Sequence, residues 1–330
     1  MLCLTCRVHR PSDRPLGLVR LRLLSVVLIA ALLASCSGPR VPAERVDRLA
    51  QQTDSLERVA RTLQQRADSL ERASALRNPN LHSTLWTQTA VEYGGLTQSV
   101  YQLARIMMNR SLSDSTWTAS LEQAERGAAA YRALPPAVVL DVDETVLDNS
   151  AYQARLVADN EMYDSASWNA WCREEQAGSV PGALAFTQYA AQQGVQVIYL
   201  TNRDAEVETA TRNNLRALGF PVNDNPDAVL TQNERDGWDP KGPRRAWVAD
   251  RFRILLLIGD NFGDFVSGAE AAQSERAALS ERYNRFWGTR WIALPNPQYG
   301  SWEGALFDFE YGRPPLETLE TKHDQLRLKR

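Results

Sequence analysis

Three short apolar runs, each followed at once by polar or acidic residues, constrain the fold of this chain more than any other feature. The runs cover residues 137–140, 195–200 and 254–258. Short continuous apolar runs are typical of strands that are buried on both faces of a parallel sheet. The intervals between them are long enough for helices, which is the pattern of an α/β fold with a doubly wound parallel sheet. Ligands of such sheets bind at the carboxyl ends of the strands, so we expect a functional site there.

The residues that follow these runs are mostly carboxylates. Asp141 and Asp143 follow the first run, and Asp260 and Asp264 follow the third. Residues at i and i+2 of an extended chain project to the same side, so Asp141 and Asp143 should lie together. Crowded like charges destabilise a fold unless a cation or ligand compensates. A single segment could be a solvated acidic turn, but three such segments in one chain favour a site.

Two further segments suit an anion. Thr201 and Asn202 follow the second run, and we expect a helix to begin there, which would offer a hydroxyl and a helix N-terminus to a phosphate oxygen. The chain holds only three lysines among its 37 basic residues. Lys241 lies inside the globular region, which suggests a task better suited to a compact ammonium than to a guanidinium. An incidental surface lysine is the alternative.

The composition excludes several classes of chemistry. Three histidines and four cysteines are too few and too badly placed for a Cys/His zinc site or a histidine-dependent triad. The formal net charge is −3, and it becomes more negative without the five arginines of residues 1–35. No large basic surface remains for a nucleic acid partner. Any chemistry must therefore rest mostly on carboxylates.

The N-terminus has the pattern of an export signal. Five arginines precede a twelve-residue apolar run, residues 23–34, which is too short to span a bilayer. The run ends in Leu33-Ala34-Ser35-Cys36, which resembles a bacterial lipobox. We expect residues 1–35 to be a lipoprotein signal peptide and Cys36 to carry a lipid that attaches the chain to a membrane. Ser37 favours the outer membrane, facing the periplasm. An ordinary signal peptide with a chance cysteine is the alternative.

Residues 36–80 are expected to form the lipid anchor and a coiled-coil stalk. The segment Asp-Ser-Leu-Glu-Arg at 54–58 recurs at 68–72, two heptads later. Leucines then fill every d position, at 49, 56, 63 and 70, while smaller residues fill the a positions. Such a stalk could join copies of the chain into a homo-oligomer. A solvated single helix or a flexible spacer remains the alternative.

Two helices are expected over residues 81–134. Their approximate apolar stripe consists of Trp86, Tyr93, Leu96, Val100 and Leu103.

Several motifs together resemble a known family. Asp141-x-Asp143, Thr201, Lys241 and Asp260-x-x-x-Asp264 resemble the four ordered motifs of the haloacid dehalogenase superfamily of phosphotransferases. The finer pattern is similar to the bacterial class C acid phosphatases, the lipoprotein 5′-nucleotidase family, over about residues 85–306. The segments that carry this similarity are 141–150, 181–183, 201–203, 259–261, 294–296, 299–300 and 302–304. The stalk is not part of the family pattern, and the third motif is thinned to Lys241-x-x-Arg244.

The resemblance implies roles for these residues. Asp141 would be the nucleophile that forms an aspartyl-phosphate, and Asp143 the acid and base. Mg²⁺ would be held by Asp141, the backbone carbonyl of Asp143 and Asp260, with Asp264 orienting the metal site. Thr201, Asn202 and Lys241 would bind the phosphate, with Arg244 as the nearest alternative to the lysine.

The resemblance also implies the domain plan. Residues 81–310 would form a haloacid-dehalogenase-like phosphatase domain with a small helical cap at about 150–185. Residues 311–330 would form a polar tail.

The implied substrate is a small phosphate monoester, such as a nucleoside or nicotinamide 5′-monophosphate. Tyr152, Trp168, Tyr299 and Trp302 are candidates to stack on its ring, and the alternative is that these aromatic residues belong to the core. Two other functions remain open: a non-catalytic envelope-anchored lipoprotein with a phosphatase-like domain, and a sugar-phosphate phosphatase or phosphotransferase on the same fold.

Overall fold

A five-stranded parallel sheet organises the larger unit of the chain. The computed structural model describes residues 42–75, 78–223, 225–310 and 312–328. The strands lie in the order β5-β4-β1-β6-β7, so β1 is central between β4 and β6. Their bounds are β1 Pro136–Leu140, β4 Gln196–Asp204, β5 Val229–Gln232, β6 Arg253–Gly259 and β7 Trp291–Ala293. The predicted α/β fold with a parallel sheet is confirmed.

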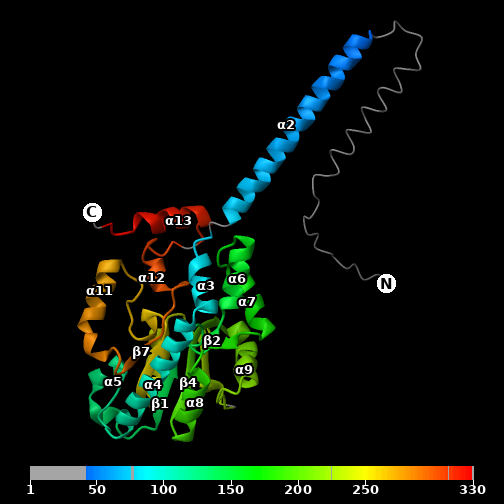
Figure 1. The fold of residues 1–330 in the computed structure, drawn as a ribbon. Helices are drawn as coiled ribbons and strands as arrows, with labels where there is room; N and C mark the ends of the chain where they lie inside the picture. The colour runs from blue at the N-terminus through cyan, green and yellow to red at the C-terminus, as the bar shows by residue number, and fades with distance from the viewer. Residues whose placement is uncertain (1–41, 76–77, 224, 311, 329–330) are drawn as a thin grey trace, which may run out of the picture. The chain divides into compact units, whose positions relative to one another are not determined.

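Both faces of the sheet are buried, as the apolar runs predicted. Along β1, Val138 and Leu140 belong to one hydrophobic cluster, while Ala137 and Val139 belong to a second one on the opposite face. This alternation follows from the two-residue period of a strand. On the first face lie α4 (Val91–Leu112) and α8 (Ala183–Gln192), and on the second lie α10 (Lys241–Ala249) and α5 (Leu121–Arg126). The result is three layers, helices on either side of the sheet (Figure 1).

The region before β1 differs from the expected pair of helices. It contains three α-helices, α3 (Leu81–Thr89), α4 and α5, and a short 3₁₀ turn. The expected apolar stripe is partly wrong, because Leu96 and Leu103 are exposed. The buried face of α4 is instead made by Tyr93, Thr97, Tyr101, Ala104, Met107, Met108 and Ser111. Three of these residues, Thr97, Ala104 and Ser111, are small or polar, so hydrophobicity alone did not identify the inner face of α4.

A helical insertion follows the first strand. A two-stranded antiparallel sheet pairs β2 (Leu147–Asp148) with β3 (Gly178–Ser179). Between these strands the chain forms α6 (Ser150–Asp159) and α7 (Ser165–Glu174). Asp164 caps α7 by accepting hydrogen bonds from the backbone N–H groups of Ala166 and Ser167. The small sheet therefore closes the base of a helical cap directly beside the end of β1.

The strand that contains the second apolar run, β4, extends beyond that run. It continues through Thr201, Asn202 and Arg203 to Asp204, where it pairs with Gln232 of β5. A 3₁₀ turn follows, and α9 begins only at Glu208 and ends at Ala217. The expected helix start at Thr201 is therefore wrong, and Thr201 lies within a strand.

The stalk segment forms one helix, α2 (Ala43–Ala75). The chain divides into two units, one ending at Asp68 and one running from Ser69 to Arg330. Along α2, the leucines of the heptad pattern are exposed. Within the part of the chain that the structure describes, none of the helices is both long and apolar enough to cross a membrane. The expected signal peptide and Cys36 lie outside the described residues.

The C-terminal segment contains a helix where a polar tail was expected. After α11 (Gln273–Arg282) and the short α12 (Ser301–Gly304), the chain forms α13 (Pro315–Asp324). The ammonium of Lys322 on α13 lies 2.5 Å from a carboxylate oxygen of Glu303 on α12. The same ammonium donates a hydrogen bond to Asn80 Oδ1 at 3.2 Å. Lys322 thus holds this segment to α12 and to the residue just before α3.

Candidate active site

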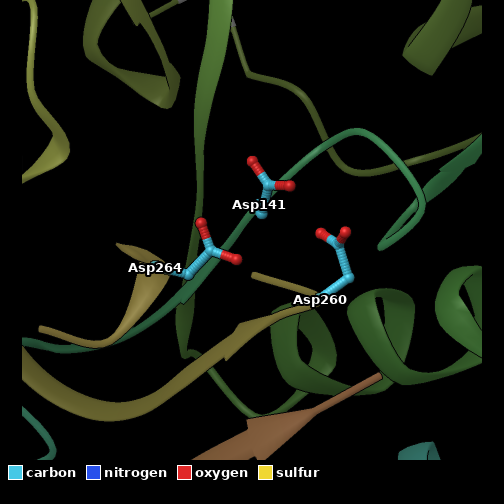
Figure 2. Close-up of side chains that lie close together, drawn as sticks. All are labelled: Asp141, Asp260 and Asp264. Atoms are coloured by element: carbon cyan, nitrogen blue, oxygen red, sulfur yellow. The ribbon is translucent and has the colours of Figure 1, made fainter. Parts of the chain in front are cut away.

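Three aspartates meet at the carboxyl ends of two neighbouring strands. Asp141 follows β1, Asp260 follows β6, and Asp264 ends the 3₁₀ turn η4 (Phe262–Asp264). One carboxylate oxygen from each lies within 4.8 Å of the other two. Figure 2 shows the three side chains around a common space. Oxygen ligands this close together fit a divalent cation such as Mg²⁺ or Ca²⁺ better than a soft metal.

Lys241 reaches the same cluster from the first turn of α10. Its ammonium pairs with Asp141 and lies 2.6 Å from Asp264 Oδ1, and the lysine is buried. The alternative of an incidental surface lysine is therefore wrong. Arg244, one turn further along α10, lies elsewhere: its guanidinium donates to the backbone of Thr201 and to Asn202 Oδ1 at 2.8 Å.

The charges of the cluster perturb one another. Burial raises the pKa of Asp141 well above its ordinary value, Lys241 opposes this rise, and the neighbouring aspartates add to it. Burial and then Asp264 raise the pKa of Asp260 to about 6. Burial by itself would lower the pKa of Lys241, but the negative charges of Asp141 and Asp264 raise it. One lysine thus offsets only part of the negative charge, which leaves room for a further cation.

Asp143 is not one of the three clustered aspartates, and its carboxylate has partners of its own. Its carboxylate is paired with the buried guanidinium of Arg203, with Nη2 at 2.8 Å and Nε at 2.9 Å from Oδ1. Asn149 Nδ2 donates to the same oxygen at 3.0 Å, and Thr201 Oγ1 donates to Oδ2 at 3.1 Å. The side chain of Asp143 is therefore held apart from the candidate metal ligands, in one fixed orientation. Thr201 takes part in holding it.

Sequence reasoning missed two residues of this network, Asn149 and Arg203. Asn149 is fully buried, and its side-chain oxygen accepts hydrogen bonds from Trp171 Nε1 at 2.9 Å and Arg203 Nη2 at 3.2 Å. Its backbone N–H donates to the buried carboxylate of Glu144 at 2.9 Å. Burial raises the pKa of Glu144 well above its ordinary value. Both residues stand inside segments that carry the family resemblance, 141–150 and 201–203. The resemblance was therefore the signal that could have identified them.

Asp260 and Asp264 are also held by neighbours. Asn296 Nδ2 donates to Asp260 Oδ2 at 2.8 Å, and Thr145 Oγ1 donates to Oδ1 at 3.3 Å. Asp264 Oδ2 accepts the backbone N–H of Asn261 at 2.9 Å, which closes a capping box around η4. These bonds orient both carboxylates toward Asp141.

The comparisons with known proteins agree with this geometry. The family described as HAD superfamily, subfamily IIIB (acid phosphatase), matches residues 74–302, which is well over half of the chain. The chain belongs to this family. The predicted relationship to the haloacid dehalogenase superfamily and its acid phosphatases is confirmed.

Solved structures of class C acid phosphatases are similar in fold to this acid phosphatase family protein. The class C acid phosphatase from Bacillus anthracis is 30% identical, with a TM-score of 0.65, and the match covers 78% of this chain and 100% of that one. The same enzyme with tungstate bound is 29% identical, with a TM-score of 0.67 and the same coverage. Acid phosphatase 1 of Solanum lycopersicum is 27% identical over 165 residues, 49% of this chain. The match spans 57% of the length of that plant relative.

Two of the four candidate stacking residues are placed wrongly for that role. Tyr152 and Trp168 are buried in the cap, where their rings pack edge to face with centroids 5.1 Å apart. The Arg203 guanidinium lies 5.5 Å from the Trp168 ring centroid, so this tryptophan packs against the residue that pairs with Asp143. Trp302 is 40% exposed, and Tyr299 is half-buried. Only these last two of the four could contact a substrate ring.

Gly259, the last residue of β6, leaves space for the Asp264 side chain to pack against the backbone. A Cβ atom at this position would lie 2.1 Å from Asp264 Oδ2. We expect Gly259→Ala to displace Asp264, to lower divalent-cation affinity and to cost about 1–3 kcal/mol of stability, as overpacking usually does. Gly263→Ala is the matched control, because its nearest neighbour would be Ala269 at 4.0 Å. Metal titration and urea unfolding measure both effects, and equal behaviour of the two variants would contradict the proposed role of Gly259.

The raised pKa of Asp260 predicts a pH effect on the metal-free protein. The folded state holds this proton up to about pH 6, whereas an unfolded aspartate loses it near 3.8. Stability relative to an Asp260→Asn variant should therefore fall as the pH rises from about 4 to about 6, and then level off. Thermal unfolding of both proteins in EDTA across this range measures the difference. Parallel curves for the two proteins would show that Asp260 titrates as an ordinary carboxyl.

Proposed function

We propose that this protein is a metal-dependent acid phosphatase that hydrolyses phosphate monoesters through an aspartyl-phosphate. One observation carries the proposal: Asp141 stands at the end of the central strand, in contact with Lys241 and beside two more carboxylates. A carboxylate can act as a nucleophile toward phosphorus when nearby positive charge offsets the repulsion between the two anions. Family membership and the similarity to class C acid phosphatases support this activity.

Mg²⁺ is the cofactor that we propose for the site. Asp141, Asp260 and Asp264 would hold it, because their oxygens already lie within 4.8 Å of one another. Hard oxygen ligands without imidazole favour magnesium over zinc. The bound cation would supply the positive charge that a phosphate dianion and an attacking carboxylate need.

The reaction then takes two steps. A carboxylate oxygen of Asp141 bonds to phosphorus as the ester P–O bond breaks. For this step Asp143 must be protonated on Oδ2, the oxygen that Arg203 does not contact, and it gives that proton to the leaving alcohol oxygen. In the second step Asp143 takes a proton from a water molecule, whose oxygen bonds to phosphorus and releases inorganic phosphate from Asp141. Thr201, Asn202 and Lys241 would contact the phosphoryl oxygens. Arg203 and Asn149 fix the direction of the Asp143 carboxylate in both steps.

The substrate that we propose is a nucleoside or nicotinamide 5′-monophosphate. Asp260 lies on the wall of a cavity of about 340 Å³ that is also lined by Phe262, Phe265, Trp287 and the half-exposed Trp302. Aromatic side chains in a cavity that reaches Asp260 could receive a flat ring. Tungstate, which the Bacillus relative binds, has the tetrahedral shape of phosphate.

Phosphate release from a panel of monoesters, with and without EDTA, tests the proposal. We expect hydrolysis of nucleoside monophosphates, loss of activity in EDTA and its return with Mg²⁺. Full activity in EDTA would refute the metal requirement, and the same efficiency for glycerol phosphate would refute a preference for a ring.

Trp302 provides a direct test of ring recognition. Trp302→Ala should raise KM for a nucleoside monophosphate by about 10-fold, since one stacking contact contributes about 1–3 kcal/mol. The KM for glycerol phosphate should change little. Tyr163→Ala is a control at an aromatic residue that is 57% exposed and does not line this cavity. An equal change for both substrates would argue for a structural role of Trp302.

We also propose that the chain is an exported bacterial lipoprotein, anchored in the outer membrane through Cys36 and facing the periplasm. The apolar run of residues 23–34 and the lipobox-like sequence before Cys36 support this. Metabolic labelling with a radioactive fatty acid should mark the protein, and Cys36→Ser should remove the label. Labelling that survives this substitution would contradict the anchor.

A further inference from the structure

The helix α2 carries a narrow apolar stripe whose leucines are exposed. The stripe consists of four leucines, one per heptad, which are exposed by 56–71%. They are Leu49, Leu56, Leu63 and Leu70. The a positions between them hold Val46, Thr53, Ala60 and Ala67. An apolar helix face exposed over its whole length points to an interaction surface.

The shape of the stripe indicates what covers it. Helices that pack on a globular domain usually show a wide apolar face, whereas a strict two-position stripe is the seam of a coiled coil. The outward positions b, c and f of α2 carry mixed charges, at Asp47, Arg48, Asp54, Arg58, Arg61 and Asp68. These charged residues fit a surface that stays in water. The seam is therefore the one face of α2 suited to burial.

We propose that the seam of α2 pairs with the seam of a second copy of this chain, parallel and in register. Identical stripes are complementary only when their heptads align, and the two-heptad repeat keeps that alignment over the whole helix. β-branched residues at a, here Val46 and Thr53, together with leucine at d favour two strands. This pairing is independent of the proposed reaction.

Charge favours the parallel direction. Glu57 stands at an e position and Gln52 at a g position. In a parallel pair, each Glu57 lies beside Gln52 of the second copy, whose amide can donate to the carboxylate. In an antiparallel pair with full overlap, the stripes centre near residue 58 and the two Glu57 carboxylates meet. Like charges at that point would oppose the antiparallel arrangement.

Cysteine cross-linking of the full chain in mild detergent tests the pairing. The background replaces Cys3, Cys6 and Cys36 with serine, while Cys172 is buried and can remain. Leu63→Cys, on the seam, should form a disulfide-linked dimer at least about tenfold faster than Gln65→Cys on the outer face, because a disulfide needs Cα atoms within about 7 Å. Equal rates for the two variants would overturn the proposal.

A mixing experiment tests the direction. When Leu49→Cys chains are mixed with Ala67→Cys chains, a parallel pair gives linked dimers of like chains only. Dimers of unlike chains would show an antiparallel pair and would overturn the proposal. Leu56→Lys with Leu63→Lys should abolish cross-linking through Ala67→Cys, whereas Arg58→Lys, on the outer face, should not. Phosphate release per chain should stay within about twofold in all of these variants, which shows that the domain remains folded.

Discussion

Replacing Asp141 with asparagine should abolish phosphate-ester hydrolysis. The amide is isosteric but cannot form the phosphoryl bond, so we expect kcat to fall on the order of 10³-fold or more, as for the loss of other nucleophiles. The fold should persist, because the amide keeps the shape of the carboxyl group and Lys241 keeps Asp264 as an ionic partner. Phosphate release and the thermal unfolding midpoint, measured on the same preparation, separate the two effects.

Asp250→Asn is the matched control for Asp141→Asn. Asp250 is exposed and pairs with Arg126 on the surface, so this substitution should leave both activity and stability almost unchanged. Acid-quenched protein should carry a phosphoryl group on the peptide that contains Asp141 in the unsubstituted protein, and lack it in Asp141→Asn. Normal turnover by Asp141→Asn would remove the aspartyl-phosphate from consideration.

Replacing Arg203 with methionine should have the second largest effect, on stability and activity together. The guanidinium is 1% exposed and the paired Asp143 side chain is 14% exposed. Breaking a buried ion pair by removing one partner typically costs about 3–5 kcal/mol. Asp143 would also lose its fixed orientation, so we expect kcat to fall by about 10²-fold, the lower range for general acid–base catalysis.

Arg173→Met is the matched control for Arg203→Met. Arg173 pairs with Glu206 at 2.9 Å, but both side chains are more than half exposed, so the expected cost is below about 1 kcal/mol. The double variant Arg203→Met with Asp143→Asn should regain stability without regaining activity, because it removes the unpaired buried charge. Urea unfolding and kcat measure this, and equal destabilisation by Arg173→Met and Arg203→Met would contradict the importance of burial.

The sheet and its acids could be predicted from the sequence because their signals are local. A strand buried on both faces leaves an apolar run, and the acids directly after the runs at 137–140 and 254–258 meet because neighbouring parallel strands end at one edge. Lys241 could be proposed from the scarcity of lysine in the chain. In the structure Lys241 is buried and contacts Asp141.

The misplaced features depend on partners far along the chain. Thr201 to Asp204 are polar and suggest the start of a helix, yet β4 continues through them because Asp204 pairs with Gln232 of β5. Arg203 can be buried because it pairs with the Asp143 carboxylate and donates a hydrogen bond to Asn149. The sequence around residue 203 reveals neither partner. The ring of Tyr152 packs on Trp168 and Trp171 in the cap. Aromatic composition alone could therefore not distinguish a core residue from one that contacts the substrate.

The order of the strands has a consequence for the newly made chain. β1 lies between β4 and β6, and β6 and Asp260 come more than a hundred residues after Asp141. A polypeptide that ends before residue 253 lacks one neighbour of its central strand and two of its three clustered acids, so a prematurely terminated product should be inert. Under the export proposed above, a chain that crosses the membrane unfolded would gain hydrolytic power only on the far side. Phosphate esters in the compartment of synthesis would thereby be spared.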